Sequence, residues 1–420
     1  MTMLFRIPSL FVLCTALPLD SAAQNCAIPF DLPLFGVRSE MDVPYGTAIR
    51  YNGSTAQLAM DIFKPVGDGQ TERPLLILVH GGGFTSGSRA DLHDLCAGLA
   101  SMGYVAVTMS YRLGFYGNGI LEPPYTYDPY EVVRAVYRSQ QDVKGAVRFL
   151  KGRSADDSTS TSSVFLAGFS AGAIACLHAA YMDLPEEKPA VCGAIGDVQH
   201  FLNFYPRPDL GGVDGDLNLN GHDASVMGVA GFFGGLLSTD LLNGSVSPAL
   251  YTYHQNGDPI VSCGHQQPYW GIGLGVPDGY PYLYGSCAID QYVQEIGHAP
   301  GHYLHHAHAG NAHEVHDPLG VLLELSHWMR DLFCASPTDV AEARAPLLRA
   351  FPNPVQDVLQ LELPDAGAWT VQVTDAQGRP VSAPRMAHGG IDVRGLAPGT
   401  YVLRALAEGH AHVTTFVVAR

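Results

Sequence analysis

Short apolar runs alternate with helix-like segments over most of the chain. Each run is short enough to be a buried strand, and this alternation of strand and helix signals predicts a mostly parallel sheet with helices packed on it. The fold class expected is therefore α/β. The predicted strands are residues 75–79, 105–110, 164–168, 226–232, 249–254 and 303–307.

The pattern changes after the last helix-like stretch, residues 318–333. A short linker is followed by brief strands with turn residues between them, which predicts a small all-β sandwich. Its strands are expected at residues 358–363, 369–374, 401–405 and 413–418. The domain boundaries predicted from this change are 24–336, a linker at 337–350, and 351–420.

The composition limits the classes of binding partner that we expect. The chain has 420 residues, of which 47% are hydrophobic, and its formal net charge is −17. Nucleic acid and anionic membranes are not expected as partners, because no basic patch offsets the acidic excess.

The first 23 residues are typical of a secretory signal peptide. Arg6 supplies the positive charge, residues 7–17 are apolar, and residues 21–23 are small, as signal peptidase requires. A membrane anchor is disfavoured, since the apolar run is shorter than the ~20 residues that span a bilayer. We therefore expect export.

Export places the cysteines in an oxidising compartment, where most should pair. Cys14 would leave with the signal peptide, so seven cysteines remain and one of them should be unpaired. A bridge between Cys263 and Cys287 would close a loop rich in Gly, Pro and Tyr, and we expect this pair. The other pairings stay open. No C-x-x-C occurs, so neither a zinc ribbon nor a redox dithiol is indicated.

Two glycine-rich motifs follow predicted strands. Residues 168–172 read Gly-Phe-Ser-Ala-Gly between an apolar run and a helix-like stretch, which is the context of a nucleophile elbow with Ser170 at its apex. The two glycines suit a turn too tight for a Cβ. Residues 80–84 read His-Gly-Gly-Gly-Phe directly after the strand at 75–79. Such a loop supplies oxyanion-hole amides in lipases and esterases.

With these two motifs in this order, the chain resembles the α/β-hydrolase superfamily, in particular its HGGG-type carboxylesterases and lipases. The resemblance extends from about residue 42 to about residue 334. It implies an eight-stranded, mostly parallel sheet, an active site at the carboxyl ends of the strands, and no cofactor. It also implies that the backbone amides of Gly82, Gly83 and Ala171 form the oxyanion hole.

In this fold the acid and the histidine follow the serine along the chain. The segment 255–261, just past the strand at 249–254, resembles the family's acid loop, and we expect Asp258 to be the acid, with Asp290 as the alternative. The segment 310–314 resembles the G-x-x-H-E turn of the family. His313 is therefore the expected base. The alternatives are His308 and His316, in a region that also holds His298, His302, His305 and His306.

Two metal interpretations are weaker. Histidines are common metal ligands, but no H-E-x-x-H is present in the histidine-rich region. Residues 214–221 alternate oxygen ligands as a calcium loop does, yet Met227 occupies the place of the glutamate that an EF-hand needs. We expect a solvated loop near the pocket entrance.

The C-terminal segment carries three further motifs, at residues 351–354, 373–379 and 395–401. In that order they resemble the sorting domain of the type IX secretion system found in the Bacteroidetes phylum. The resemblance implies that residues 351–420 engage that machinery and direct the protein across the outer membrane. The alternative is a sandwich module that binds substrate or carbohydrate.

The function expected is that of an exported serine carboxylesterase or lipase that acts on a small or polymeric ester. A serine peptidase of the same fold and a non-catalytic surface-binding protein are the alternatives. Aromatic residues at 115–116, 125–127 and 269–270 either line an apolar pocket or pack the loops, and the acyl and alcohol preferences stay open.

Overall fold

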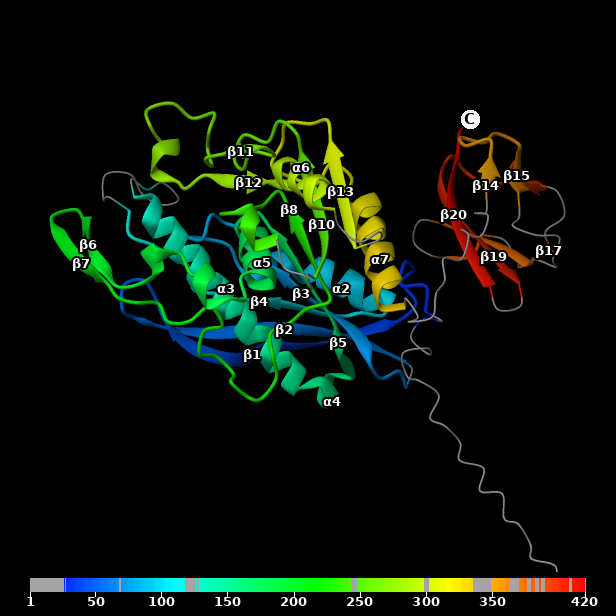
Figure 1. Cartoon of the computed structure of the whole chain (residues 1–420). Helices are drawn as coiled ribbons and strands as arrows, with labels where there is room; N and C mark the ends of the chain where they lie inside the picture. Colours follow the sequence, from blue (N-terminus) through cyan, green and yellow to red (C-terminus); the bar gives the residue numbers. More distant parts are fainter. Residues whose placement is uncertain are drawn as a thin grey trace, which may run out of the picture. The chain divides into compact units, whose positions relative to one another are not determined.

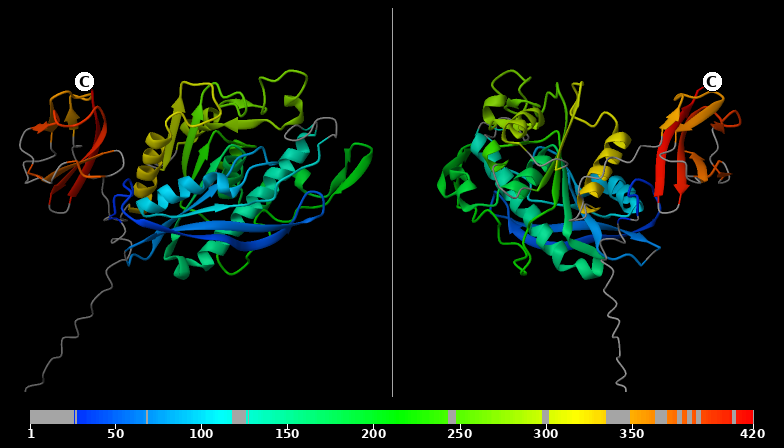
Figure 2. Two further views of the ribbon diagram at one scale, coloured as in Figure 1. Left: turned by 180° about the vertical axis from the view of Figure 1, so that it is seen from behind. Right: turned by 45° about the vertical axis from the view of Figure 1, so that its right-hand side comes forward.

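The computed structural model describes most of the chain, in two compact units. The units are Met1–Ala335 and Ser336–Arg420, and each is considered by itself (Figures 1 and 2). The predicted signal peptide and residues 337–348 of the predicted linker lie outside the described residues. The described residues are 26, 28–67, 69–117, 126, 128–242, 248–297, 302–334, 349–362, 370–375, 379–381, 385–386, 390–407 and 410–419.

The first unit is built on an eight-stranded sheet with the strand order β1-β2-β4-β3-β5-β8-β10-β13 (Figure 1). The pairs β1–β2 and β2–β4 are antiparallel, and all the others are parallel. The predicted α/β class is confirmed. The bounds are β1 (Gly36–Ile49), β2 (Thr55–Val66), β3 (Arg73–Val79), β4 (Val105–Met109), β5 (Thr159–Phe169), β8 (Gly228–Phe232), β10 (Ala249–Gln255) and β13 (Tyr303–His308).

All six strands predicted for this unit occur in the structure, but β1 and β2 were not predicted from the apolar runs. β1 is mostly exposed at the edge of the sheet, so it lacks the continuous apolar run of a strand buried on both faces. The boundaries differ elsewhere by a few residues. β5 begins at Thr159 rather than 164, and β8 begins at Gly228 rather than 226.

Helices cover both faces of this sheet (Figure 2). Along β3, Leu75, Ile77 and Val79 pack with residues of α3 and α5, whereas Leu76 and Leu78 pack with residues of α2 and α7. This strict alternation is the period of two that a strand buried on both sides imposes. The helices are α2 (His93–Met102), α3 (Pro129–Gly152), α4 (Ser154–Asp157), α5 (Ala171–Tyr181), α6 (Ser286–Ile296) and α7 (Pro318–Cys334), with 3-10 turns at Arg89–Leu92, Pro185–Glu187, Ala190–Cys192, Thr239–Leu242 and Pro277–Gly279.

Two smaller β elements complete the unit. A hairpin of β6 (Ile195–His200) and β7 (Asn203–Arg207) follows α5 in the chain. A three-stranded sheet is formed by β9 (Gly235–Leu236), β11 (His265–Gln266) and β12 (Leu283–Gly285). The last two of these strands belong to the insertion after β10.

The segment 207–225 covers a polar face of α3. Gln140 Nε2 donates to the Val213 carbonyl at 2.8 Å, and Arg148 Nε donates to the Leu217 carbonyl at 2.9 Å. Such bonds satisfy polar groups that the covering segment takes out of water. This explains why α3 contains many buried charged and amide side chains.

The Asp- and Asn-rich loop 214–221 is part of this cover. Asn218 Nδ2 donates to the carbonyls of Tyr45 and Gly145, at 2.8 and 3.0 Å. Asp214 pairs with Lys144 at 2.9 Å. The loop is thus tied to β1 and α3 by hydrogen bonds and an ion pair.

Two disulfides join distant segments of the first unit. Cys263 is bonded to Cys287, as predicted. Cys26 is bonded to Cys334 at the end of α7. The expectation of one unpaired cysteine in the mature chain is wrong, because Cys96, Cys176 and Cys192 are all free. All three are buried, where a cysteine behaves as a small apolar side chain.

The second unit consists of two antiparallel sheets around a separate core, as the predicted sandwich requires (Figure 1). Leu359 and Ile391 from one sheet pack with Val373, Leu403 and Phe416 from the other. The strands are β14 (Arg349–Phe351), β15 (Val358–Glu362), β16 (Thr370–Asp375), β17 (Arg385–Met386), β18 (Gly390–Asp392), β19 (Gly399–Ala407) and β20 (His410–Val418).

Within the described part of the chain, no helix combines the length and the apolar character that crossing a membrane demands.

Candidate active site

Ser170 stands at a sharp turn between β5 and α5. Its backbone has φ +54° and ψ −120°, an uncommon conformation for a residue with a side chain. The two flanking glycines are sterically required. A Cβ on Gly168 would lie 2.2 Å from the Gly172 carbonyl oxygen, and one on Gly172 would lie 2.2 Å from that of Val79. The turn therefore holds the serine at its apex by backbone contacts alone.

The structure brings Ser170, His313 and Asp258 into one hydrogen-bonded series. His313 Nε2 is 2.8 Å from Ser170 Oγ, and His313 Nδ1 is 2.7 Å from Asp258 Oδ2. The serine follows β5, the aspartate follows β10, and the histidine follows β13, so all three lie at the carboxyl ends of parallel strands. Sites of open α/β sheets form at this edge.

The Asp258 carboxylate is fully buried but well supplied with donors. Its Oδ1 accepts the backbone N–H groups of Ile260 and Val261, at 2.8 and 3.1 Å. Burial alone would raise the pKa of Asp258, but hydrogen bonds from His254 and His313 outweigh burial, and the pKa lies below its ordinary value. The group is therefore ionised at neutral pH and can accept a hydrogen bond from His313.

His254 and Trp270 lie next to the aspartate. His254 was not among the expected site residues, and Trp270 was expected only as one of the aromatic residues that line a pocket or pack the loops. His254 is fully buried, and its Nε2 lies 2.8 Å from the Val261 carbonyl and 3.4 Å from Asp258 Oδ2. Trp270 Nε1 donates to the Asp258 carbonyl at 2.8 Å. The only signal in the sequence is their position, one in the strand before the acid loop and one in the insertion after it.

The other candidates lie in different networks. His308 stacks on His316 with ring centroids 3.5 Å apart, and His316 Nδ1 is bonded to the Tyr253 hydroxyl at 2.8 Å. Asp290, on α6, accepts a hydrogen bond from the Tyr303 hydroxyl at 3.0 Å. Among the residues that the structure describes, no group of three or more His, Cys, Asp or Glu side chains is arranged to hold a metal ion.

The loop after β3 adopts the left-handed backbone that its glycines permit. Gly82 and Gly83 have φ values of +112° and +59°, and a Cβ on Gly82 would lie 2.2 Å from the Ser86 carbonyl oxygen. The Gly82 carbonyl accepts the N–H groups of Thr85 and Ser86, both at 3.0 Å. These bonds fix the orientation of the peptide plane between Gly82 and Gly83.

A small apolar pocket opens beside the serine. Its volume is about 50 Å³, and Ser170, Gly83 and Ala171 lie in its wall. Of the aromatic residues singled out in the sequence, Tyr269 lines this pocket, whereas Tyr116 lines another and residues 125 and 127 lie outside the described residues. The other lining residues are Phe84, Val132, Val136, Ile174, Ile260, Val261, Pro268, Tyr280, Pro281 and Leu283.

Comparison with protein families gives two matches. Residues 39–122 match the model of the carboxylesterase family, and residues 349–419 match that of the secretion system C-terminal sorting domain. The chain is a carboxylic ester hydrolase with a C-terminal sorting domain. The sorting domain marks this hydrolase for export by type IX secretion, to the cell surface or the medium.

Several solved structures are similar to the hydrolase at low identity. A truncated carbohydrate esterase from gut microbiota has a TM-score of 0.44 and 12% identity, over 72% of this chain and 98% of that one. Esterase 2 of Thermogutta terrifontis, phosphoramylated by tabun, has a TM-score of 0.42 and 16% identity, over 70% of this chain and 93% of that one. The propionate-bound form of that esterase has a TM-score of 0.40 and 17% identity, over 68% of this chain and 92% of that one. No curated protein matches the chain.

The steric role of Gly172 leads to a first prediction. Changing Gly172 to Ala should abolish folding to the active form, because the new Cβ would meet the backbone oxygen of Val79, which cannot rotate away. Soluble yield and the midpoint of thermal unfolding measure the effect.

Gly98 in α2 is the matched control, since a Cβ there meets no heavy atom within 4 Å. Alanine at this helical position should be neutral or stabilise the hydrolase by about 0.5–1 kcal/mol. A Gly172→Ala protein with wild-type stability and activity would contradict the close contact.

Proposed function

We propose that the hydrolase cleaves carboxylic esters through an acyl-enzyme on Ser170, with His313 as general base and Asp258 as the acid that orients it. The observation that carries the proposal is the position of His313, within 2.8 Å of the Ser170 hydroxyl and 2.7 Å of the Asp258 carboxylate. With an ionised Asp258 as acceptor, Nδ1 of His313 carries the proton and Nε2 is free to accept one.

The reaction then runs in two halves. Ser170 Oγ attacks the ester carbonyl carbon while its proton moves to His313 Nε2, and the tetrahedral intermediate collapses as His313 returns that proton to the departing alcohol oxygen. Water then loses a proton to His313 Nε2 and attacks the acyl carbon. The second tetrahedral intermediate collapses as the bond to Ser170 Oγ breaks, His313 returns the proton to Ser170, and the carboxylic acid product is released.

The oxyanion of the intermediate would be held by backbone amides of Gly83 and Ala171, with Gly82 as a further donor. The N–H and C=O of one trans peptide point in opposite directions. Because the Gly82 carbonyl is turned toward Thr85 and Ser86, the Gly83 N–H points the other way. Ala171 begins α5, where the first N–H groups have no partner within the helix. Donors fixed in this manner need little reorganisation as charge develops.

The size of the serine pocket favours a short acyl group. A water-sized group needs about 10–15 Å³ of such space. About 50 Å³ therefore accommodates only a few heavy atoms, which corresponds to acyl groups from acetyl to butyryl. The walls are apolar, so a charged acyl group would lose its hydration without gaining a partner.

We further propose that residues 24–336 form the catalytic domain and that residues 351–420 engage the type IX machinery rather than the substrate. The support is that Ser170, His313 and Asp258 all belong to the first unit, while the second has a separate apolar core.

The roles assigned to Ser170 and His313 predict a large loss of turnover when either side chain is removed. Ser170→Ala and His313→Ala should each lower kcat by about 10⁴-fold or more, because members of such a triad act as a unit. Turnover of p-nitrophenyl acetate, with circular dichroism to verify folding, measures the effect. His308→Ala and Asp290→Asn are the controls, since both residues lie in other networks, and they should keep near-normal kcat.

Near-normal turnover by Ser170→Ala would contradict the serine mechanism. An inactive but folded His308→Ala would indicate that His308, rather than His313, is the general base. Release of nitroaniline from an aminoacyl anilide at a rate comparable to that of the ester would indicate a peptidase instead.

The pocket volume predicts the order of acyl preference. The value of kcat/KM for p-nitrophenyl esters should be highest between acetyl and butyryl and should fall at least about tenfold at octanoyl, for which the pocket has no room. Val136→Ala should shift the preference toward longer chains, because Val136 lines the pocket.

Val133→Ala removes the same two methyl groups three residues earlier in α3, outside the pocket lining, and should leave the preference unchanged. An octanoyl ester hydrolysed as well as the acetyl ester by the unmodified enzyme would refute the short-acyl assignment.

A further inference from the structure

A second pocket lies on the opposite side of α3 from the serine. Val132 and Val136 line the serine pocket, whereas Glu131, Arg134 and Arg138 line the second. With 3.6 residues per turn, these two sets point to nearly opposite faces of the helix. The second pocket has a volume of about 420 Å³, within the range of roughly 300–1,000 Å³ typical of small-molecule sites.

Arginine side chains are concentrated in this pocket. Five arginines line it, although the whole chain has only 23 Lys and Arg residues against 40 Asp and Glu. Two of the five are neutralised by acids, Arg112 by Asp142 at 2.7 Å and Arg207 by Asp128 at 2.7 Å. The other three are Arg50, Arg134 and Arg138.

Arg134 and Arg138 are 2% and 3% exposed, yet neither has an acid within 4 Å among the residues described in this unit. Arg134 donates to three backbone carbonyls, those of Val191, Gly193 and Pro208. Arg138 donates to one, that of Gly114, at 3.0 Å. Buried guanidinium groups are normally paired with an anion.

The acids that line the pocket do not supply this pairing. Glu131 accepts the Tyr116 N–H at 3.1 Å and lies 3.8 Å from Arg207. Asp209 is bonded to Lys188 at 2.7 Å, and Asp216 is exposed. Burial lowers the pKa of Arg138 to about 10, and the neighbouring charges of Arg112 and Arg134 add to this effect against the opposing influence of Glu131. An added anion would relieve that repulsion.

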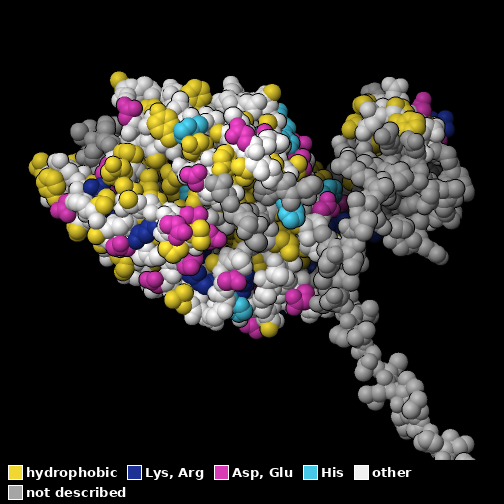
Figure 3. All heavy atoms as spheres, viewed as in Figure 1, with side chains coloured by type: hydrophobic (Ala, Val, Ile, Leu, Met, Phe, Trp, Pro, Cys, Tyr) yellow, Lys and Arg dark blue, Asp and Glu magenta, His cyan; other side chains and the backbone are white. Residues whose placement is uncertain are grey.

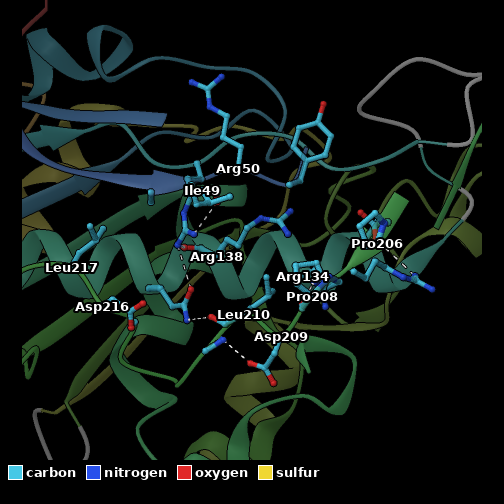
Figure 4. Close-up of a pocket in the computed structure, with 18 of the residues that line it drawn as sticks. Ile49, Arg50, Arg134, Arg138, Pro206, Pro208, Asp209, Leu210, Asp216 and Leu217 are labelled. Carbon is cyan, nitrogen blue, oxygen red and sulfur yellow. Dashed lines mark hydrogen bonds and ion pairs between the residues drawn. The ribbon is translucent and has the colours of Figure 1, made fainter. Parts of the chain in front are cut away.

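The geometry of the pocket indicates where such an anion would bind. Figure 4 shows Arg138 reaching from α3 into the pocket, while Arg50 stands at the rim and points outward. Tyr51 and Tyr116 form an aromatic part of the wall, with ring centroids 4.9 Å apart and an edge-to-face arrangement. An arginine fork matches a carboxylate, and a tyrosine face or edge matches the flat side of a ring.

We propose that this pocket is an accessory binding site for a carboxylate carried on a six-membered ring, with the carboxylate on Arg138 and the ring against Tyr51 and Tyr116. A uronic acid and an aromatic acid share this chemistry. The site is separate from the serine pocket, and its existence does not depend on the proposed ester chemistry.

Isothermal titration calorimetry on the Ser170→Ala protein tests the site without turnover. The probes are glucuronate and benzoate, with glucose and benzyl alcohol as their uncharged counterparts. Saturable 1:1 binding of either acid, weakened by added salt and absent for the uncharged partners, is expected, and the acid that binds more tightly identifies the class of ligand. Equal heats from an acid and its uncharged counterpart would overturn the proposal.

Arg138→Gln should weaken binding about tenfold or more, because it removes a charge-assisted hydrogen bond to the carboxylate. Arg148→Gln is the matched control: Arg148 is a buried arginine of the same helix that donates to backbone carbonyls and lies outside the pocket lining. Undiminished binding by folded Arg138→Gln would overturn the proposal.

Arg138 also holds Gly114, whose N–H donates to the Phe84 carbonyl beside Gly83, so its replacement could disturb folding. Tyr51→Leu therefore provides an independent variant, because it removes the ring without removing a charge, and it too should weaken binding. Binding that Tyr51→Leu leaves intact would locate the acid elsewhere and contradict the site. The same holds for binding to the unmodified enzyme that prior phosphonylation of Ser170 abolishes.

Discussion

The contact on which the site depends is the close approach of α5 to β3. Gly172 leaves no room for a Cβ against the Val79 carbonyl, and Gly168 leaves none against Gly172. At this turn Ser170 adopts a φ of +54°, and its hydroxyl lies 2.8 Å from His313 Nε2. The close approach also brings the loop after β3 next to the serine, because a Cβ on Gly81 would lie 3.2 Å from Ser170 Cβ. The candidate nucleophile and the candidate oxyanion donors are thus positioned by one backbone constraint.

A second requirement is a buried negative charge. Asp258 is removed from water completely, which would be costly without compensation. Two backbone N–H groups, His313 and the nearby His254 provide that compensation, and they hold the carboxylate in one orientation. The insertion that follows Asp258 supplies several of the residues that line the serine pocket. The disulfide between Cys263 and Cys287 holds the two ends of this insertion together.

Features set by local sterics could be predicted from the sequence, and features set by long-range packing could not. The elbow at Ser170 and the parallel strands were predictable, because glycines at tight turns and apolar runs leave a direct trace in the sequence. The edge strand β1 left no such trace, since its side chains are largely exposed. His254, Trp270 and the cover of α3 by residues 207–225 arise from contacts between segments that a sequence pattern does not connect. The three free cysteines show the same limit, because an odd number of thiols says nothing about how many are buried.

Covalent labelling is the most direct test of whether Ser170 is a nucleophile activated by His313. The full mature chain is treated with a fluorophosphonate probe and digested, and the modified peptide is identified by mass spectrometry. We expect a single adduct on Ser170 that forms much more slowly in His313→Ala and at a normal rate in His308→Ala. Labelling of a different residue, or labelling of Ser170 at the same rate in folded His313→Ala, would contradict it.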